Sequence, residues 1–271
     1  MAIPKIDYTE KQINNLIKGI YDEYVNEYNL PKKLYNETAS ILKKAVYKGY
    51  GGKLASFDYG TPDYELLSEL RDNVYMFSGA KTYTQVKEIS SLMYEGNEKL
   101  SFSDFKKKAL AKYDTYNKAY LETEYVTALT SGTEAIQWQS AQEYIKLFPQ
   151  LKYTAILDQH TSEICKRLDG VVMPTNSPFW NIHTPPNHFN CRCHIEKIDK
   201  YDTEPNTNPS VVKSITKFTD ENMQGVFKMN PGKDRVVFKT KGEDKHPYFD
   251  VEPKDKVLAK KNFNLPIPEK D

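Results

Sequence analysis

The sequence predicts an α+β protein in three parts: an elongated, mainly α-helical N-terminal body, a small loop-rich α/β unit with a Cys/His cluster, and an extended C-terminal tail with a hairpin. Three observations predict it. Apolar residues recur at helical spacing as far as Tyr144, a β-prone run and many Cys and His residues follow Lys152, and Pro- and Asn-rich sequence begins beyond Asp202. We expect the domain boundaries at 1–150, 151–200 and 201–271.

The first two helices are predicted from apolar stripes and their end signals. Over residues 9–28 apolar side chains recur at spacings of three and four, and Thr9 with Gln12 forms a capping-box pattern. A second helical stretch runs from 32 to about 48, where Gly51-Gly52 breaks it.

The rest of the N-terminal body is also predicted to be helical. A helix opens at Thr61-Pro62 and Gly79 can close it, and a short helix spans 84–94. Residues 101–144 hold two long helices, with a break or a kink at 130–133, because serine, threonine and glycine are poor mid-helix residues. The many tyrosines along this stretch indicate helix packing rather than a ligand site.

The C-terminal part contains weaker signals. Residues 203–210 are typical of a linker, because Pro, Asn and Thr offer little to bury. The runs 225–228 and 235–239 flank Asn230-Pro231-Gly232-Lys233, which favours a hairpin. We expect the last residues, rich in lysine and proline, to be extended.

Composition excludes several classes of protein. Hydrophobic residues make up 39%, too many for a disordered chain, and a formal net charge of +1 provides no global basic field for nucleic acid. No apolar run approaches the roughly 18 residues of a membrane span, and residues 1–10 lack a signal-peptide core. We therefore expect no membrane partner, and a protein that is made and kept in the cytosol.

The cysteines and histidines are concentrated in one region. Cys165, Cys191 and Cys193 share a stretch of about 35 residues with all the histidines except His246. Cys165, His188, Cys191 and Cys193 form a possible Cys3His set, and zinc binds such ligands as a tetrahedron that stabilises small units. On an extended strand the C-x-C pair places both sulfurs on one side.

Three interpretations of these residues stay open from the sequence. They are a structural zinc site, a disulfide from Cys165 to Cys191 or Cys193, and buried thiols that pack. We expect no catalytic residue: Asp158 and Asp169 are favoured as turn or cap residues, and neither a GxSxG elbow, a GxxxxGK[ST] loop nor a GxGxxG fingerprint occurs.

A specific motif order surrounds the cluster. A strand that ends in aspartate is followed by a segment with Thr and Cys, then by an L-x-G turn, and finally by the sequence P-P-x-H-x-x-C-R-C. The matching residues are Ile156-Leu157-Asp158, Thr161, Cys165, Leu168-Asp169-Gly170 and Pro185 to Cys193. The helix before it reads T-E-[YF]-x-x-A at 123–128. Over roughly residues 118–195 this resembles the minor head proteins of tailed bacteriophages that are similar to the F protein of phage Mu. This chain has His160 and Ser162 where that family often has Arg and a further Cys.

The resemblance implies a structural role. A few copies of such a protein join the procapsid and associate with the portal protein and other head proteins. They assist head morphogenesis, DNA packaging or DNA delivery, without catalysis. It implies a place in the virion near the portal, and in the host cytoplasm during assembly. Any contact with phage DNA should be weak and local, through lysines such as Lys106-Lys107-Lys108 or Lys260-Lys261.

Two other functions compete with this one. Asn190-Cys191-Arg192-Cys193-His194-x-x-Lys197 suggests a zinc-supported His-Cys or HNH nuclease, but the usual pairs of C-x-x-C ligands are missing. A toxin-type effector behind a head domain needs a sizeable extra domain, and only about 70 residues follow the cluster.

Overall fold

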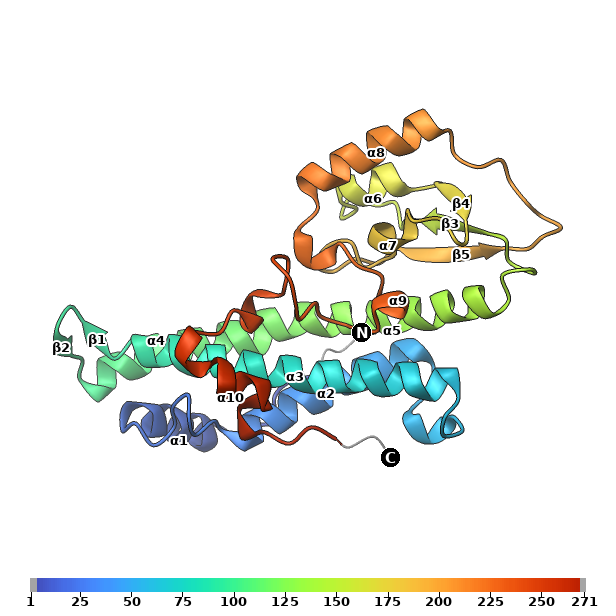
Figure 1. Cartoon of the computed structure of the whole chain (residues 1–271). Coiled ribbons are helices and arrows are strands. Elements are labelled where there is room, and N and C mark those ends of the chain that lie inside the picture. Colours follow the sequence, from blue (N-terminus) through green and yellow to red (C-terminus); the bar gives the residue numbers. More distant parts are fainter. Residues whose placement is uncertain (1–3, 269–271) are drawn as a thin grey trace. The chain divides into compact units, whose positions relative to one another are not determined.

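The α+β prediction is confirmed. The computed structural model describes residues 4–268, in which helices predominate and two small antiparallel sheets occur (Figure 1). The chain forms two compact units: unit 1 comprises residues 4–43, 74–125 and 247–268, and unit 2 comprises 44–73 and 126–246. Within residues 4–268, none of the helices is both long enough and apolar enough to span a bilayer. The domain boundaries expected at 150 and 200 remain a prediction.

The first helix is shorter than its apolar stripe predicts. Helix α1 (Glu10–Tyr21) begins with the expected capping box of Thr9 and Gln12, and it contributes Leu16, Ile17 and Ile20 to the core of unit 1. It ends before residue 28 because Glu23 has a left-handed φ of 62° and the Asn26 side chain accepts backbone N–H groups of the following turn. Local polar contacts therefore override the stripe.

Helix α2 (Lys32–Tyr50) matches its prediction and leads through η1 (Leu54–Ser56) to helix α3 (Pro62–Ser91). The expected helix end at Gly79 is wrong, since α3 is 30 residues long and continues past Gly79 to Ser91. A Cβ atom at Gly79 would lie 2.4 Å from Asn262 Oδ1. The glycine thus allows the C-terminal segment of unit 1 to approach the helix, and it does not end it.

After α3, strands β1 (Tyr94–Glu95) and β2 (Glu98–Lys99) form a small hairpin that the sequence did not indicate. Helix α4 (Phe102–Asp114), a π-helical turn η2 (Thr115–Tyr120) and helix α5 (Leu121–Glu143) follow. The helical stretch is irregular at 115–120 and continuous through 130–133, so the break or kink was predicted at the wrong place.

Two glycines explain why α5 continues through residues 130–133. A Cβ atom on Gly132 would lie 2.5 Å from the carbonyl oxygen of Val46 in α2, and one on Gly49 would lie 2.0 Å from that of Leu129. Within unit 2 the two helix backbones therefore touch at glycine positions. The glycine that suggests a helix break is a close-packing residue.

We predict that Gly132→Ala destabilises the protein. In a free helix, alanine is more stable than glycine by roughly 0.5–1 kcal/mol. Here the added methyl group would contact a backbone carbonyl that cannot move aside, which typically costs about 1–3 kcal/mol. Denaturant unfolding monitored by circular dichroism would measure the change; a variant as stable as the wild type or more so would contradict the close packing.

The second sheet belongs to unit 2 and has the order β4-β3-β5, with β3 (Gln150–Thr154) in the centre. Its antiparallel neighbours are β4 (Val172–Pro174) and β5 (His194–Ile198). Helices α6 (Glu163–Leu168), α7 (Trp180–His183) and α8 (Pro209–Asn222) lie around it (Figure 1). Leu151, Tyr153 and Ile195 point into one core with Trp180.

Each outer edge of this sheet has a partner. Thr207 bonds the backbone of Val172 in both directions, so the expected linker at 203–210 covers the edge of β4. On the other side the Glu134 carboxylate of α5 accepts the N–H of Ile195 at 3.1 Å. Glu134 is fully buried, and its Oε1 atom has no hydrogen-bond partner in the part of the chain that the structure describes.

The predicted C-terminal hairpin is wrong. The stretch from 225 to 239, all of it described, forms the short helices η3 (Gly225–Phe227) and α9 (Pro231–Asp234) and has no strand. Asn230 caps α9 through the N–H groups of Gly232 and Lys233. The N–H groups of Val237 and Phe238 bond to Asn73 of α3 instead of a partner strand.

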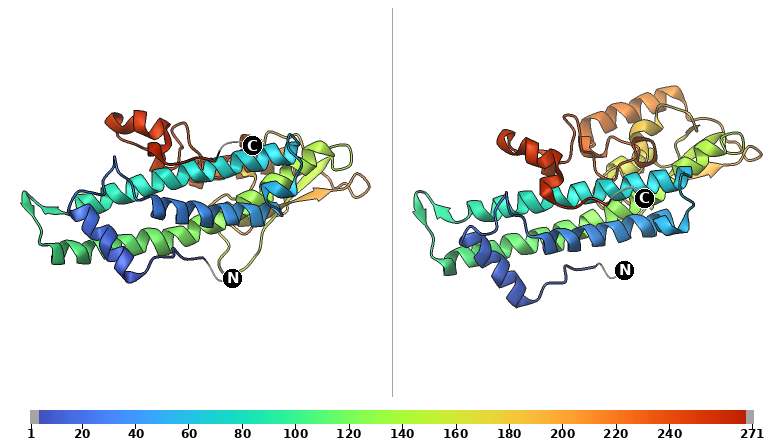
Figure 2. Two further views of the ribbon diagram at one scale, coloured as in Figure 1. Left: turned by 90° about the horizontal axis from the view of Figure 1, so that it is seen from below. Right: turned by 60° about the horizontal axis from the view of Figure 1, so that its bottom comes forward.

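The segment 247–267 is not an extended tail. It forms η4 (Pro247–Phe249), η5 (Pro253–Asp255), α10 (Lys256–Lys260) and η6 (Asn262–Asn264), and it lies along α3 in unit 1 (Figure 2). We call it the C-terminal strap.

Side chains that are buried, apart from the exposed Tyr28, bond the strap to the rest of unit 1. Its Asp255 accepts the hydroxyl groups of Tyr28 and Tyr83, and Phe263 stacks on Tyr83 with ring centroids 4.7 Å apart. Its Tyr248 hydroxyl donates to Glu124, which forms a buried ion pair with Lys81. These contacts explain why a stretch rich in lysine and proline is ordered.

Candidate metal centre

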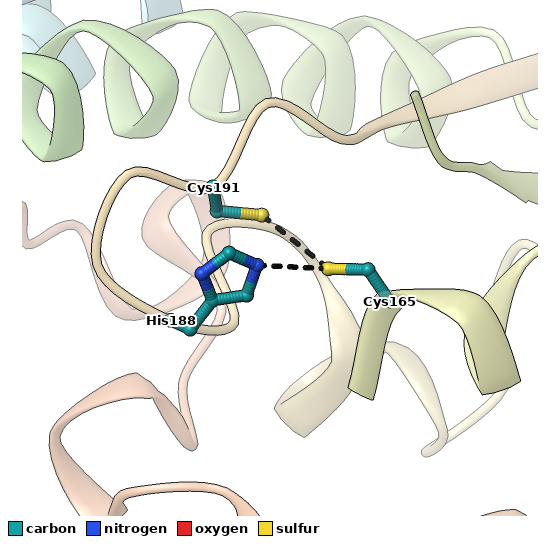
Figure 3. Close-up of side chains that lie close together, drawn as sticks. All are labelled: Cys165, His188 and Cys191. Atoms are coloured by element: carbon teal, nitrogen blue, oxygen red, sulfur yellow. Dashed lines mark hydrogen bonds between the residues drawn. The ribbon is translucent and has the colours of Figure 1, made fainter. Parts of the chain in front are cut away.

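Three of the four predicted ligands meet in unit 2 (Figure 3). Cys165 comes from α6, while His188 and Cys191 come from the loop before β5. Cys165 Sγ lies 3.1 Å from His188 Nε2 and 3.9 Å from Cys191 Sγ, and all three ligand atoms lie within 4.8 Å of one another. The group could bind a metal ion.

The His188 ring is oriented as a metal ligand requires. Its Nδ1 atom lies 2.7 Å from the carbonyl oxygen of Phe189, so Nδ1 carries the proton and donates it. Nε2 then presents its lone pair to the sulfurs. Histidine ligands commonly donate their second ring nitrogen to a carbonyl or carboxylate in this way, which fixes both tautomer and orientation.

The spacing also fits a tetrahedral site better than a disulfide. Ligands at about 2.3 Å from zinc place two sulfurs about 3.8 Å apart, whereas a disulfide needs about 2.05 Å. The cysteines are free thiols. A cavity of about 10 Å³, close to the room one small ion or water requires, opens here; its lining residues are Ile156, His160, Thr161, Cys165, His188, Asn190, Arg192 and Cys193.

Cys193, the fourth predicted ligand, is buried and lines the same cavity, but its sulfur is not part of the 4.8 Å group among the described residues. Hydrogen bonding to Cys165 raises the pKa of Cys193 to about 11. The pKa of Cys191 is also raised, chiefly by its hydrogen bond to Cys165. The pKa of Cys165 is lowered by the hydrogen bonds from the other two thiols.

The pKa of His188 is also shifted. Burial lowers the pKa of His188, but the hydrogen bond and electrostatic interaction with Cys165 outweigh burial and raise it. Two cysteine sulfurs beside an imidazole form a donor set that zinc prefers.

Local structure holds the ligands in place. Ser162 caps α6 by accepting the N–H of Cys165, and Thr130 of α5 donates to the carbonyl oxygen of Cys191. Arg192 binds Asp158 through two hydrogen bonds of 2.8 and 2.7 Å. This ion pair holds the pKa of Asp158 well below its usual range. Asp158 thus links the segment after β3 to the loop before β5.

The other histidines of the region lie outside the ligand group. His183 is buried and bonds Phe179 and Thr219, and His194 is partly exposed next to Glu196. His160 is exposed but lines the cavity.

Sequence reasoning missed Tyr153 and Asn187, which contact each other beside the cluster. Strand alternation could have placed Tyr153 inward, but no sequence pattern indicates the loop residue Asn187.

Comparison with known proteins confirms the family resemblance. Residues 83–196 match the family model described as "Phage Mu protein F like protein". We call residues 83–196 the Mu F-like segment. It contains α4, α5, β3, β4, the beginning of β5 and all four predicted ligands.

Two relatives are similar over part of this region. The chain is 36% identical over 72 residues to "Putative capsid assembly protein F" of Escherichia phage Mu, and 29% identical over 84 residues to the "Mu-like prophage FluMu F protein" of Haemophilus influenzae. These matches cover 27% and 31% of this chain, but only 16% and 19% of the relatives. No solved structure matches the chain significantly.

Proposed function

We propose that this protein is a minor head protein of a tailed bacteriophage, which associates with the portal vertex and assists head morphogenesis, DNA packaging or DNA delivery. The observation that carries the proposal is the Mu F-like segment with its H-x-x-C-R-C loop, similar to a protein named for capsid assembly. The role requires no catalysis. It implies a place in the virion near the portal, and in the host cytoplasm during assembly.

We further propose that the cluster binds one structural zinc ion through Cys165, His188, Cys191 and Cys193. When bound, zinc supplies a rigid cross-link between its ligands. The chain places these ligands on α6 and on the loop before β5, in a unit whose sheet has strands of only three to five residues. A small unit of this kind gains stability from a metal cross-link.

Direct DNA contact is secondary in this proposal. Several lysines of α4 already have acidic partners: Lys107 pairs with Asp104, Lys108 with Glu95 and Lys112 with Glu88. These pairs reduce the local positive field that a phosphate backbone would meet. The partners expected first are the portal protein and other head proteins.

Co-purification with the portal protein of the same phage tests the proposed function. The tagged full-length chain is expressed with the portal protein and, as a control, with the major capsid protein alone. Retention of the portal protein is expected. In parallel, particles that lack this protein should assemble but package or deliver DNA poorly. Normally filled, fully infectious particles without it, or its absence from purified heads, would overturn the proposal.

A further inference from the structure

A buried tyrosine contacts the candidate metal centre without being a ligand. Tyr153 of β3 is 0% exposed, and its hydroxyl oxygen lies 3.3 Å from Cys165 Sγ. The same hydroxyl donates to Asn187 Oδ1 at 2.9 Å. Asn187, also buried, is fixed because its Nδ2 group donates to the carbonyl oxygens of Ile182 and Thr184.

The phenol has one proton and two neighbouring acceptors. While Cys165 is a thiol, its S–H group can donate to the phenol oxygen, and the phenol proton serves Asn187. Metal binding releases the thiol proton to solvent and leaves a thiolate. Only the phenol can then donate a proton to the hydrogen bond between its oxygen and the Cys165 sulfur. We expect it to donate to the thiolate, because a hydrogen bond to a charged acceptor is stronger than one to a neutral amide.

We propose that Tyr153 is a positioning residue of the metal centre, whose hydroxyl donates to the metal-bound thiolate of Cys165, with Asn187 as its acceptor when the metal is absent. The inference rests on the proposed metal site. The hydrogen bond offsets thiolate charge in a buried setting and fixes the direction of the sulfur lone pairs. Removing such a partner typically weakens metal binding by about 10- to 100-fold.

Cobalt(II), a spectroscopic substitute for zinc, tests the inference on the full chain. Tyr153→Phe removes only the hydroxyl group. We expect its dissociation constant for cobalt(II) to rise about 10-fold or more. The thiolate-to-cobalt charge-transfer band should also move to longer wavelength, because the sulfur donates more freely without the hydrogen bond. Loss of packing alone would not shift this band.

Tyr50→Phe is the matched control. Tyr50 is also a buried tyrosine of unit 2, and its hydroxyl donates to Asp63 rather than to the cluster. It should leave both the affinity and the band unchanged. Asn187→Ala removes the competing acceptor, so the band should move to shorter wavelength; this variant decides the question if Tyr153→Phe does not fold.

The outcomes separate the two proposals. If the wild-type protein binds neither cobalt(II) nor zinc, the metal site itself fails. If the wild type binds cobalt(II) but the band stays unmoved in Tyr153→Phe and Asn187→Ala, the metal site stands and the role of Tyr153 is overturned.

Discussion

Removal of zinc by a chelator is expected to lower the midpoint of thermal unfolding by about 10 °C. A ligand present at about 1,000 times its dissociation constant stabilises the folded state by about 4 kcal/mol. For a chain of this size each kcal/mol shifts the midpoint by roughly 2–4 °C. Differential scanning calorimetry with and without chelator measures the effect.

Single substitutions identify the ligands. Cys165→Ser should abolish the zinc found by elemental analysis and reproduce the chelator effect, and Cys193→Ser should do the same if its sulfur completes the tetrahedron. His194→Ala is the matched control, because His194 follows directly after Cys193 but its side chain is partly exposed and bonded to Glu196. The proposed site would be contradicted by a wild-type protein that contains no zinc and whose midpoint of thermal unfolding does not change when the chelator is added.

Glu134→Gln is expected to stabilise the protein increasingly as the pH rises from 4 to 7.5. Burial raises the pKa of Glu134 well above its usual value, against a smaller opposing effect of the Ile195 N–H. The stability that the Glu134 carboxyl contributes is therefore present below its unfolded-state pKa. It is lost as the pH rises, because the unfolded chain gives up the proton while the folded chain retains it. Each pH unit over which the folded protein keeps this proton and the unfolded chain does not lowers the stability by about 1.4 kcal/mol relative to glutamine.

The test is the difference in unfolding free energy between variant and wild type across that pH range. Glutamine keeps an oxygen to accept the Ile195 N–H, so any constant packing difference cancels when the slope is compared. Glu122→Gln, at an exposed position on the same helix, is the matched control. A pH-independent difference for Glu134→Gln would show that this carboxyl is solvated.

The helices of the N-terminal part were predictable because their signals are local. Apolar spacing and the Thr9 capping box depend on neighbours in sequence, and α1 and α2 begin where those signals place them. The glycines were not predictable in the same way. Gly79 and Gly132 resemble helix breaks, yet each allows a distant segment to approach, and only the fold reveals which segment that is.

The residues of the candidate site were likewise predictable only where their signal is local in the sequence. The concentration of Cys and His residues predicted Cys165, His188, Cys191 and Cys193 as one ligand set, and the family motif order supports the same residues. Tyr153, Asn187 and Glu134 act through contacts between residues 12 to 61 positions apart, which no spacing rule reports. The tail failed for a related reason: Val237 and Phe238 satisfy their backbone on Asn73, more than 160 residues earlier, instead of on each other.

The C-terminal strap has a consequence for the order in which the protein is made. Translation delivers residues 4–43 and 74–125 of unit 1 well before residues 247–267, which they bind through Tyr28, Tyr83 and Glu124. Residues 126–246 of unit 2, including the metal ligands, emerge from the ribosome in between. Unit 1 must therefore wait with Tyr83 and the Lys81–Glu124 pair uncovered, and a nascent chain interrupted near residue 246 would contain a finished unit 2 beside an unfinished unit 1. Chaperones and proteases would act on such incomplete chains. A folded unit 1 is therefore found only in a polypeptide whose synthesis has included the C-terminal strap.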